Sequence, residues 1–310
     1  MADPAAVALR FALYIDLMLL FGLAAFGLYA LRGSERASRS VLPLRPLLAG
    51  AAIVGLGVSV LWLLSLAAAM VGVPVAEVDA DTVSMVLSGT SIGAAWLARV
   101  AALLLAAVAA ALVPRRPRAA LATIAFGGVV ALGSLAWTGH GAASEGPAGW
   151  VHLLADIAHL LAAGVWIGAL FAFALLLFRR ASVMTAERLV LSHRALSGFS
   201  VVGTGAVAVL VVTGAISTWV LVGPDRLAAL PTTTYGLLLL VKLALFAGML
   251  GLAAANRFRL TPTLNRGFDL SDHLAALRAL RLSLLAETAS AAAILALVAW
   301  LGLLEPPASL

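Results

Sequence analysis

Two histidines and an aspartate stand inside the otherwise apolar segment GWVHLLADIAHLLAAGVW, residues 149–166. At 100° per residue along a helix, His152, Asp156 and His159 fall within about 60° of one another on one face. Imidazole nitrogens suit copper and zinc ions, and a carboxylate can either bind the ion or orient an imidazole. The types and spacing of these side chains therefore predict a metal-binding stripe along one helix.

A second explanation of the stripe is structural, because polar side chains within a membrane also join helices through hydrogen bonds. Ionisable groups in hydrocarbon cost about 3 kcal/mol each, so they normally face a bundle interior or water and have partners. His140 and Glu145 precede the stripe in the segment WTGHGAASEGPAGW and add two candidate ligands at the same end of the helix. Both the metal-binding and the structural explanation remain open at this point.

Four further ionisable residues lie well inside apolar runs: Asp16, Arg99, Lys242 and Glu287. As two acids and two bases, they can neutralise one another in structural pairs or form a relay for protons or ions. Trp96 precedes Arg99 by one helical turn, so we expect it to stack on the guanidinium. Arg10 stands near the end of its run, where we expect it to reach the membrane interface by snorkelling.

The composition indicates a membrane protein. The chain has 310 residues, of which 63% are hydrophobic and 11% are charged, and its mean hydropathy is +1.10. It contains no cysteine, which excludes disulfides, thiolate zinc sites, iron–sulfur clusters and cysteine nucleophiles. Because it also lacks a Gly-rich phosphate loop, a nucleophile elbow and an HExxH motif, we do not expect an enzyme.

Apolar runs long enough to cross a bilayer recur along the whole chain. They predict an all-α, polytopic membrane protein with eight transmembrane helices, at about 6–31, 47–72, 88–113, 119–138, 150–178, 199–222, 235–256 and 282–304. The first run lacks a basic start and continues as a full span, so we expect no cleavable signal peptide. Segment 73–87 is predicted to be an acidic loop with a short interfacial helix, and 257–281 a connection that is partly helical from Ser271.

The distribution of arginine predicts the orientation of these helices. The linkers after odd-numbered helices carry many arginines, whereas those after even-numbered helices contain only Arg226 as a basic residue. By the positive-inside rule both termini face the outer side, and the stripe opens outward with His152 near the interface. This topology accounts for the net charge of +6 and the pI near 10.9, so no nucleic-acid partner is expected.

Several segments resemble the CopD family of bacterial copper-resistance and copper-uptake membrane proteins. They are ADIAHLLAAGVWIGAL at 155–170, FSVVGTGAVAVLVVTGAIST at 199–218, YGLLLLVKLALFAGMLGLAAANRFRLTP at 235–262, RLSLLAETASAAAILALVAWLGLLEPP at 281–307 and, earlier, TSIGAAWLAR at 90–99. The resemblance implies an eight-helix inner-membrane protein that moves copper inward from the periplasm, often alongside a soluble CopC carrier. The matching polar positions are His159 with Trp166, Lys242, Glu287 and Arg99, whereas His152, Asp156 and His140 rest mainly on geometry. We expect a three-helix region at 1–118 and a CopD-like five-helix region at 119–310.

The leading hypothesis is copper handling, in which the ion binds the outward-opening stripe and passes inward past buried carboxylates such as Glu287. The lack of thiols favours an imidazole and oxygen site, which tolerates copper(II). One alternative is a haem-binding redox protein of the cytochrome b type, but its inner candidate ligands, His193 and His273, are expected in loops. Another is a scaffold that delivers copper to an oxidase under assembly. Because ligand imidazoles must be neutral, copper uptake is expected to weaken as external pH falls.

Overall fold

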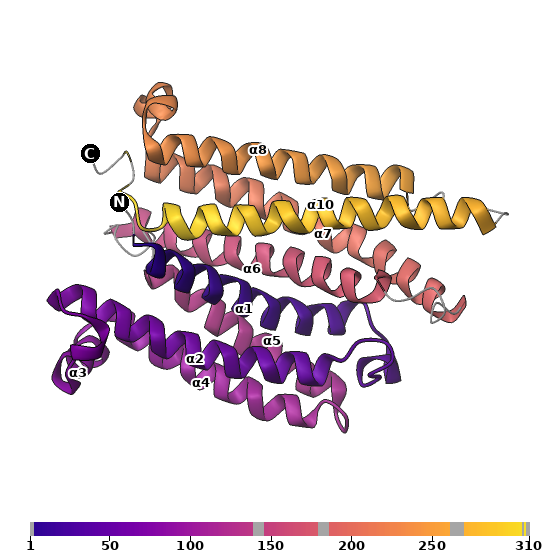
Figure 1. The fold of residues 1–310 in the computed structure, drawn as a ribbon, viewed down its shortest axis with the longest axis horizontal. Coiled ribbons are helices and arrows are strands. Elements are labelled where there is room, and N and C mark those ends of the chain that lie inside the picture. The colour runs from indigo at the N-terminus through magenta and orange to yellow at the C-terminus, as the bar shows by residue number, and fades with distance from the viewer. Residues whose placement is uncertain (1–2, 139–145, 179–185, 261–269, 306, 308–310) are drawn as a thin grey trace.

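A computed structural model of the chain describes residues 3–138, 146–178, 186–260, 270–305 and 307, and every regular element in these ranges is helical (Figure 1). The elements in order are α1 (Pro4–Tyr29), η1 (Gly33–Arg36), α2 (Leu44–Val71), η2 (Val75–Glu77), α3 (Ala80–Gly89), α4 (Ser91–Leu112), α5 (Pro117–Gly133), η3 (Ser134–Thr138), α6 (Gly146–Leu177), α7 (Ala186–Val222), η6 (Pro224–Thr232), α8 (Thr234–Ala255), η7 (Asn256–Leu260) and α10 (Leu270–Leu301). Eight of the described helices are long and apolar enough to cross a membrane. The predicted all-α class and the eight predicted spans are confirmed.

Two helices begin well before the apolar runs that predicted them. α7 begins at Ala186 instead of 199, and α10 begins at Leu270 instead of 282. Their first turns have the sequences AERLVLSHR and LSDHLAALRALR. The charged residues in them end the apolar run but do not interrupt the helix. His193 and His273 therefore lie on helices, and their expected place in loops is wrong. The short helix expected within 73–87 is present as α3.

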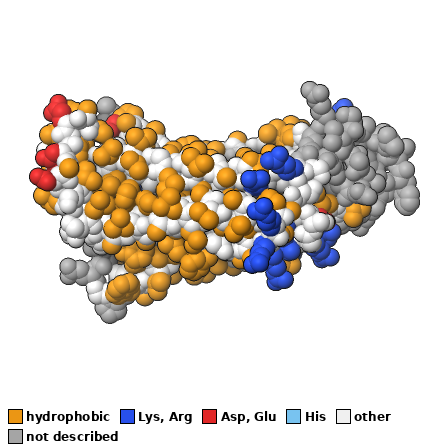
Figure 2. All heavy atoms as spheres, turned by 90° about the horizontal axis from the view of Figure 1, so that it is seen from below, with side chains coloured by type: hydrophobic (Ala, Val, Ile, Leu, Met, Phe, Trp, Pro, Cys, Tyr) orange, Lys and Arg blue, Asp and Glu red, His pale blue; other side chains and the backbone are white. Residues whose placement is uncertain are grey.

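The charged side chains separate toward the two ends of the bundle. Figure 2 shows Lys and Arg gathered toward one end of the visible face and Asp and Glu at the other. The acidic end includes η2 and α3, and both termini lie at that end in Figure 1. We call these the arginine end and the termini end. The separation fits the positive-inside rule, while the assignment of the two ends to sides of a membrane stays a prediction.

Some arginines at the arginine end also form hydrogen bonds with the carbonyl groups at the C-terminal ends of helices. Arg36 donates from Nε to the Gly27 carbonyl and from Nη2 to the Leu28 carbonyl, both at 3.0 Å, at the C-terminal end of α1. Arg281 of α10 donates to the Leu177 carbonyl at the end of α6, at 2.8 Å. The last carbonyls of a helix have no intrahelical partner and carry the negative end of its dipole. These arginines therefore satisfy the groups that a helix end leaves unpaired.

An ion pair joins η1 to α7 at the same end. Arg194 Nη2 lies 2.6 Å from Glu35 Oε2 and 2.7 Å from Oε1. Burial alone would raise the pKa of Glu35, but hydrogen bonds from the Arg194 side chain and the Arg32 backbone, with the positive charge of Arg194, hold it below its ordinary value. Because both side chains are partly exposed, the pair contributes only about 0.2–1 kcal/mol of stability.

α1 is the central helix and packs against α2, α5, α6 and α10. Its closest contact is with α6, where Gly22 faces Gly164 and Gly168. A Cβ atom added at Gly22 would lie 2.8 Å from Gly168 Cα, closer than real Cβ atoms approach. Small residues at such a crossing allow two helix backbones to touch, and this close packing drives helix association in a membrane. The glycines thus set the position of α6, which carries the candidate site.

The glycine contact predicts that Gly168→Ala destabilises the protein. The added methyl would lie 2.7 Å from the Gly22 carbonyl oxygen, so the helices must separate. We expect a loss of about 1–3 kcal/mol, the usual cost of overpacking, measured as a lower melting temperature in detergent. Gly248→Ala on α8 is the matched control, because nothing lies within 4 Å of an added Cβ there. A Gly168→Ala protein that melts no lower than Gly248→Ala would contradict this role of the crossing.

Candidate metal site

The stripe lies near the start of α6, toward the termini end of the bundle. His152 Nε2 lies 3.9 Å from Asp156 Oδ1, so the predicted approach of these two side chains is present. The His152 side chain is fully buried, and neither ring nitrogen has a hydrogen-bond partner among the described residues. Burying an imidazole without such a partner costs free energy. The Asp156 side chain is 28% exposed, so the carboxylate is partly open.

α7 supplies hydroxyl partners to the same stripe. His159 Nδ1 lies 2.8 Å from Thr213 Oγ1, and the Ser217 hydroxyl lies 3.4 Å from Asp156 Oδ1. Trp166, further along the stripe, packs edge-to-face on Phe199 of α7 with ring centroids 5.6 Å apart. The sequence prediction missed both hydroxyls, although VLVVTGAIST shows them four residues apart within an apolar run.

α8 brings a positive charge to the stripe. Lys242 is half-buried, and its charge acts on both Asp156 and His159. Tyr235, at the start of α8, is buried and also lies within the field of Asp156. The carboxylate that influences Lys242 therefore belongs to the stripe on α6.

The complete metal-ligand set is not present among the described residues. In these ranges, no three His, Asp or Glu side chains come together closely enough to hold a metal ion. His140 and Glu145 lie outside the described residues. The structure thus joins His152 with Asp156 and places His159 deeper on the same helix, while a copper site formed by these residues with His140 stays a prediction.

Glu287 has a neighbour that the sequence did not indicate. It is 3% exposed on α10, and Asn256 donates a side-chain hydrogen bond to its Oε1. Asn256 begins η7, a turn of π-helix directly after α8. Single π-helical turns are frequent at functional sites. The partner of this buried acid is therefore a neutral amide on the adjacent helix.

Arg99 is fully buried on α4, but Trp96 is not the residue that covers it. Its guanidinium lies 5.4 Å from the centroid of Trp62 on α2, and its Nε donates to Ser134 Oγ at 2.8 Å. Trp96 instead donates from its indole to the Ser59 carbonyl, at 2.8 Å. The expected stacking of Trp96 on Arg99 is wrong. The guanidinium packs on Trp62 of the neighbouring helix α2, and not on the tryptophan one turn away on its own helix.

Asp16 does not neutralise Arg99. Among the described residues, no ion pair within 4.0 Å joins them, and Asp16 Oδ2 has no hydrogen-bond partner. Asp16 is 8% exposed and faces α2, where a Cβ added at Gly55 would lie 2.5 Å from its Oδ2. The proposed relay through Asp16, Arg99, Lys242 and Glu287 stays a prediction.

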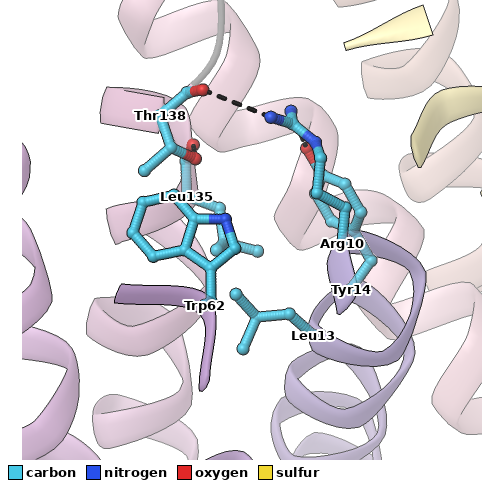
Figure 3. Close-up of a pocket in the computed structure, with 6 residues that line it drawn as sticks. All are labelled: Arg10, Leu13, Tyr14, Trp62, Leu135 and Thr138. Carbon is cyan, nitrogen blue, oxygen red and sulfur yellow. Dashed lines mark hydrogen bonds between the residues drawn. The ribbon is translucent and has the colours of Figure 1, made fainter. Parts of the chain in front are cut away.

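Arg10 also departs from expectation. It is 8% exposed, and it donates to the Thr138 carbonyl at 3.5 Å and to the Tyr14 hydroxyl at 3.4 Å. Figure 3 shows it beside a small pocket that is lined by Arg10, Leu13, Tyr14, Trp62, Leu135 and Thr138. The expected snorkelling of Arg10 is wrong, because η3, and Gly302 after α10, enclose the guanidinium.

The fold and the buried polar groups define an α-helical membrane protein with a polar stripe inside its bundle. Residues 1–150 match the family described as "Copper resistance protein D-like, N-terminal domain", and residues 193–301 match "Copper resistance protein D". The chain is 47% identical over 306 residues to Copper resistance protein D of Pseudomonas syringae pv. tomato, covering 99% of this chain and 98% of that protein. It is 27% identical over 270 residues to Inner membrane protein YebZ of Escherichia coli (strain K12), covering 85% and 87%. The chain belongs to the copper resistance protein D family.

The resemblance to the CopD family is thereby confirmed, and it covers more of the chain than the quoted segments do. The N-terminal match includes residues 1–89, in which none of the quoted segments lies. No solved structure matches the chain. The division into regions 1–118 and 119–310 stays a prediction.

The environment of Arg99 predicts that Ser134→Ala destabilises the protein. Among the described residues, this hydroxyl is the only hydrogen-bond partner of the buried guanidinium. Leaving a buried donor unsatisfied costs about 1–3 kcal/mol, which would appear as a lower melting temperature in detergent. Ser88→Ala is the control, because Ser88 is exposed and bonds only within α3. Equal melting temperatures for the two variants would show that Arg99 does not depend on Ser134.

Proposed function

We propose that the chain handles copper at the bacterial inner membrane and imports the ion from the periplasm to the cytoplasm. Family membership supports copper, and the similarity to Inner membrane protein YebZ of Escherichia coli supports the inner membrane. The ion would bind first between His152 and Asp156, with His140 as a further ligand, and would then pass to His159 deeper on α6. A CopC-like periplasmic carrier would be a suitable donor of the ion.

The observation that carries this proposal is the environment of His152. A histidine that serves only to join helices would bond to a neighbouring helix. His152 is instead fully buried, has no hydrogen-bond partner among the described residues and lies 3.9 Å from the Asp156 carboxylate. An imidazole lone pair beside a carboxylate is a donor set that suits copper, including copper(II). Binding an ion would compensate the cost of burying this imidazole.

The route inward would follow α6 and then approach α10. At 1.5 Å per residue, His159 lies about 10 Å deeper than His152. Glu287, bonded to Asn256 near the arginine end of α8, offers a later carboxylate. Lys242 would balance the charge of Asp156 when no ion is bound. Asp16 and Arg99 belong to the α1, α2 and α4 side of the bundle, so we propose that they support packing or proton movement and do not bind copper.

Copper titration of purified protein tests the site. We expect His152→Ala/His159→Ala to bind copper at least about tenfold more weakly than wild type, because it loses two imidazole ligands. His193→Ala is the matched control, since this histidine lies on the arginine-end extension of α7. Equal stoichiometry and affinity in the double variant and the wild type would overturn the proposed site.

Copper accumulation in sealed vesicles separates import from the alternatives. A transporter accumulates copper and the double variant does not, whereas a delivery scaffold binds the ion without accumulating it. A haem protein would show a Soret band after expression with ample haem. Binding without accumulation would exclude import, and a Soret band lost in the histidine variants would favour the redox alternative.

A further inference from the structure

We propose that Thr213 of α7 fixes the tautomer of His159, so that the imidazole proton stays on Nδ1 and Nε2 is the nitrogen offered to copper. This inference rests on the proposed function and adds a positioning residue to it. The Thr213 hydroxyl has a single proton, and the atom to which it donates this proton determines the state of the imidazole.

That proton is committed to the backbone of α7. Thr213 Oγ1 lies 2.6 Å from the Val209 carbonyl oxygen and 3.4 Å from the Leu210 carbonyl oxygen. A carbonyl can only accept, so the hydroxyl must donate to it. Threonine commonly makes this bond to the carbonyl four residues earlier in a helix, and its branched Cβ restricts rotation away from it.

The remaining contact of the hydroxyl then determines the state of the imidazole. His159 Nδ1 lies 2.8 Å from the same oxygen. With its proton already donated, that oxygen accepts, and the hydrogen of this bond must come from Nδ1. A neutral imidazole carries one N–H and one lone pair. The lone pair is therefore on Nε2, to which no described residue is hydrogen-bonded.

The surroundings of the ring support a fixed orientation. Thr213 is 6% exposed, so water competes little for its hydroxyl. A Cβ added at Gly214 would lie 3.8 Å from His159 Cε1, so the ring edge packs directly against α7. One turn along α7, Ser217 lies 3.0 Å from the Thr213 carbonyl and 3.4 Å from Asp156 Oδ1. Two hydroxyls one turn apart on α7 thus face two candidate ligands about one turn apart on α6, Thr213 beside His159 and Ser217 beside Asp156.

The chemical consequence is a prepared ligand. Histidines that bind metals usually donate their other ring N–H to a neighbouring acceptor, which sets the tautomer and makes the coordinating nitrogen more basic. Loss of such a partner typically weakens metal binding about 10–100-fold. Thr213 would do this for His159, although its own oxygen does not touch the ion.

The test is nitrogen NMR of metal-free protein with ¹⁵N-labelled histidine, using His159→Gln to assign the signals. Wild type and Thr213→Ser are expected to show a protonated Nδ1 and an unprotonated Nε2. Thr213→Val, which has nearly the same shape without the hydroxyl, should shift toward the Nε2–H tautomer that imidazole prefers in water. If the Thr213→Val protein does not fold, Thr213→Ala is measured in its place. A wild-type Nε2–H tautomer, or no change in Thr213→Val, would overturn the inference.

Copper titration of the same variants gives the second measurement. We expect Thr213→Val to bind copper about 10–100-fold more weakly and Thr213→Ser to restore the affinity. Because the tautomer is determined without metal, the two proposals fail separately. Normal copper binding with the wrong tautomer would overturn only the role of Thr213. The expected tautomers, with no copper binding in the wild type, would overturn only the proposed function.

Discussion

Direct contact between the backbones of α1 and α6 fixes the frame in which the polar groups of this bundle are placed. Gly22 and Gly168 leave no room for a Cβ, so the backbones of the two helices touch there. Along α6, Gly164 and Gly168 lie about 130° around the helix from the stripe of His152, Asp156 and His159. The contact with α1 therefore turns the stripe toward α7, where Thr213 meets His159 and Phe199 meets Trp166.

The buried polar groups are stabilised mainly by neutral partners on neighbouring helices. Arg99 bonds to Ser134, Glu287 to Asn256, and His159 to Thr213. A buried ion pair must recover the cost of desolvating two charges, whereas a hydroxyl or amide partner adds no second charge. Across the described residues this favours polar contacts between helices over the acid–base pairs that the sequence alone made plausible. Lys242 is the half-buried base whose charge is influenced by an acid of the stripe, Asp156.

The features that sequence predicted well are those that the bilayer imposes on every chain. A span needs about 20 apolar residues and basic loops mark one side, so the class, the eight spans and the segregation of charge were predictable. Helical periodicity likewise predicted that His152 would approach Asp156. Which helix faces which was not predictable, because it depends on where small residues allow backbones to touch. Hence Trp62 and not Trp96 covers Arg99, and Thr213 was missed. The extensions of α7 and α10 were missed because charged turns stay helical without being apolar.

The packing of α6 against α1 also limits which helices could move when an ion passes through the bundle. In the most apolar stretch of each span, 61% of the residues of α1 and 56% of those of α6 are buried. The corresponding shares are 22% for α7 and 11% for α8. Moving α6 against α1 would break the close contact of Gly22 with Gly168. The contacts of α7 with the stripe combine ring packing of Phe199 on Trp166 with hydrogen bonds through single hydroxyls, and each such hydrogen bond can break and re-form at a net cost of about 1 kcal/mol. If the chain imports copper as proposed above, we expect α8, the least buried of these four helices, to move relative to α1 and α6 more readily than these two move against each other.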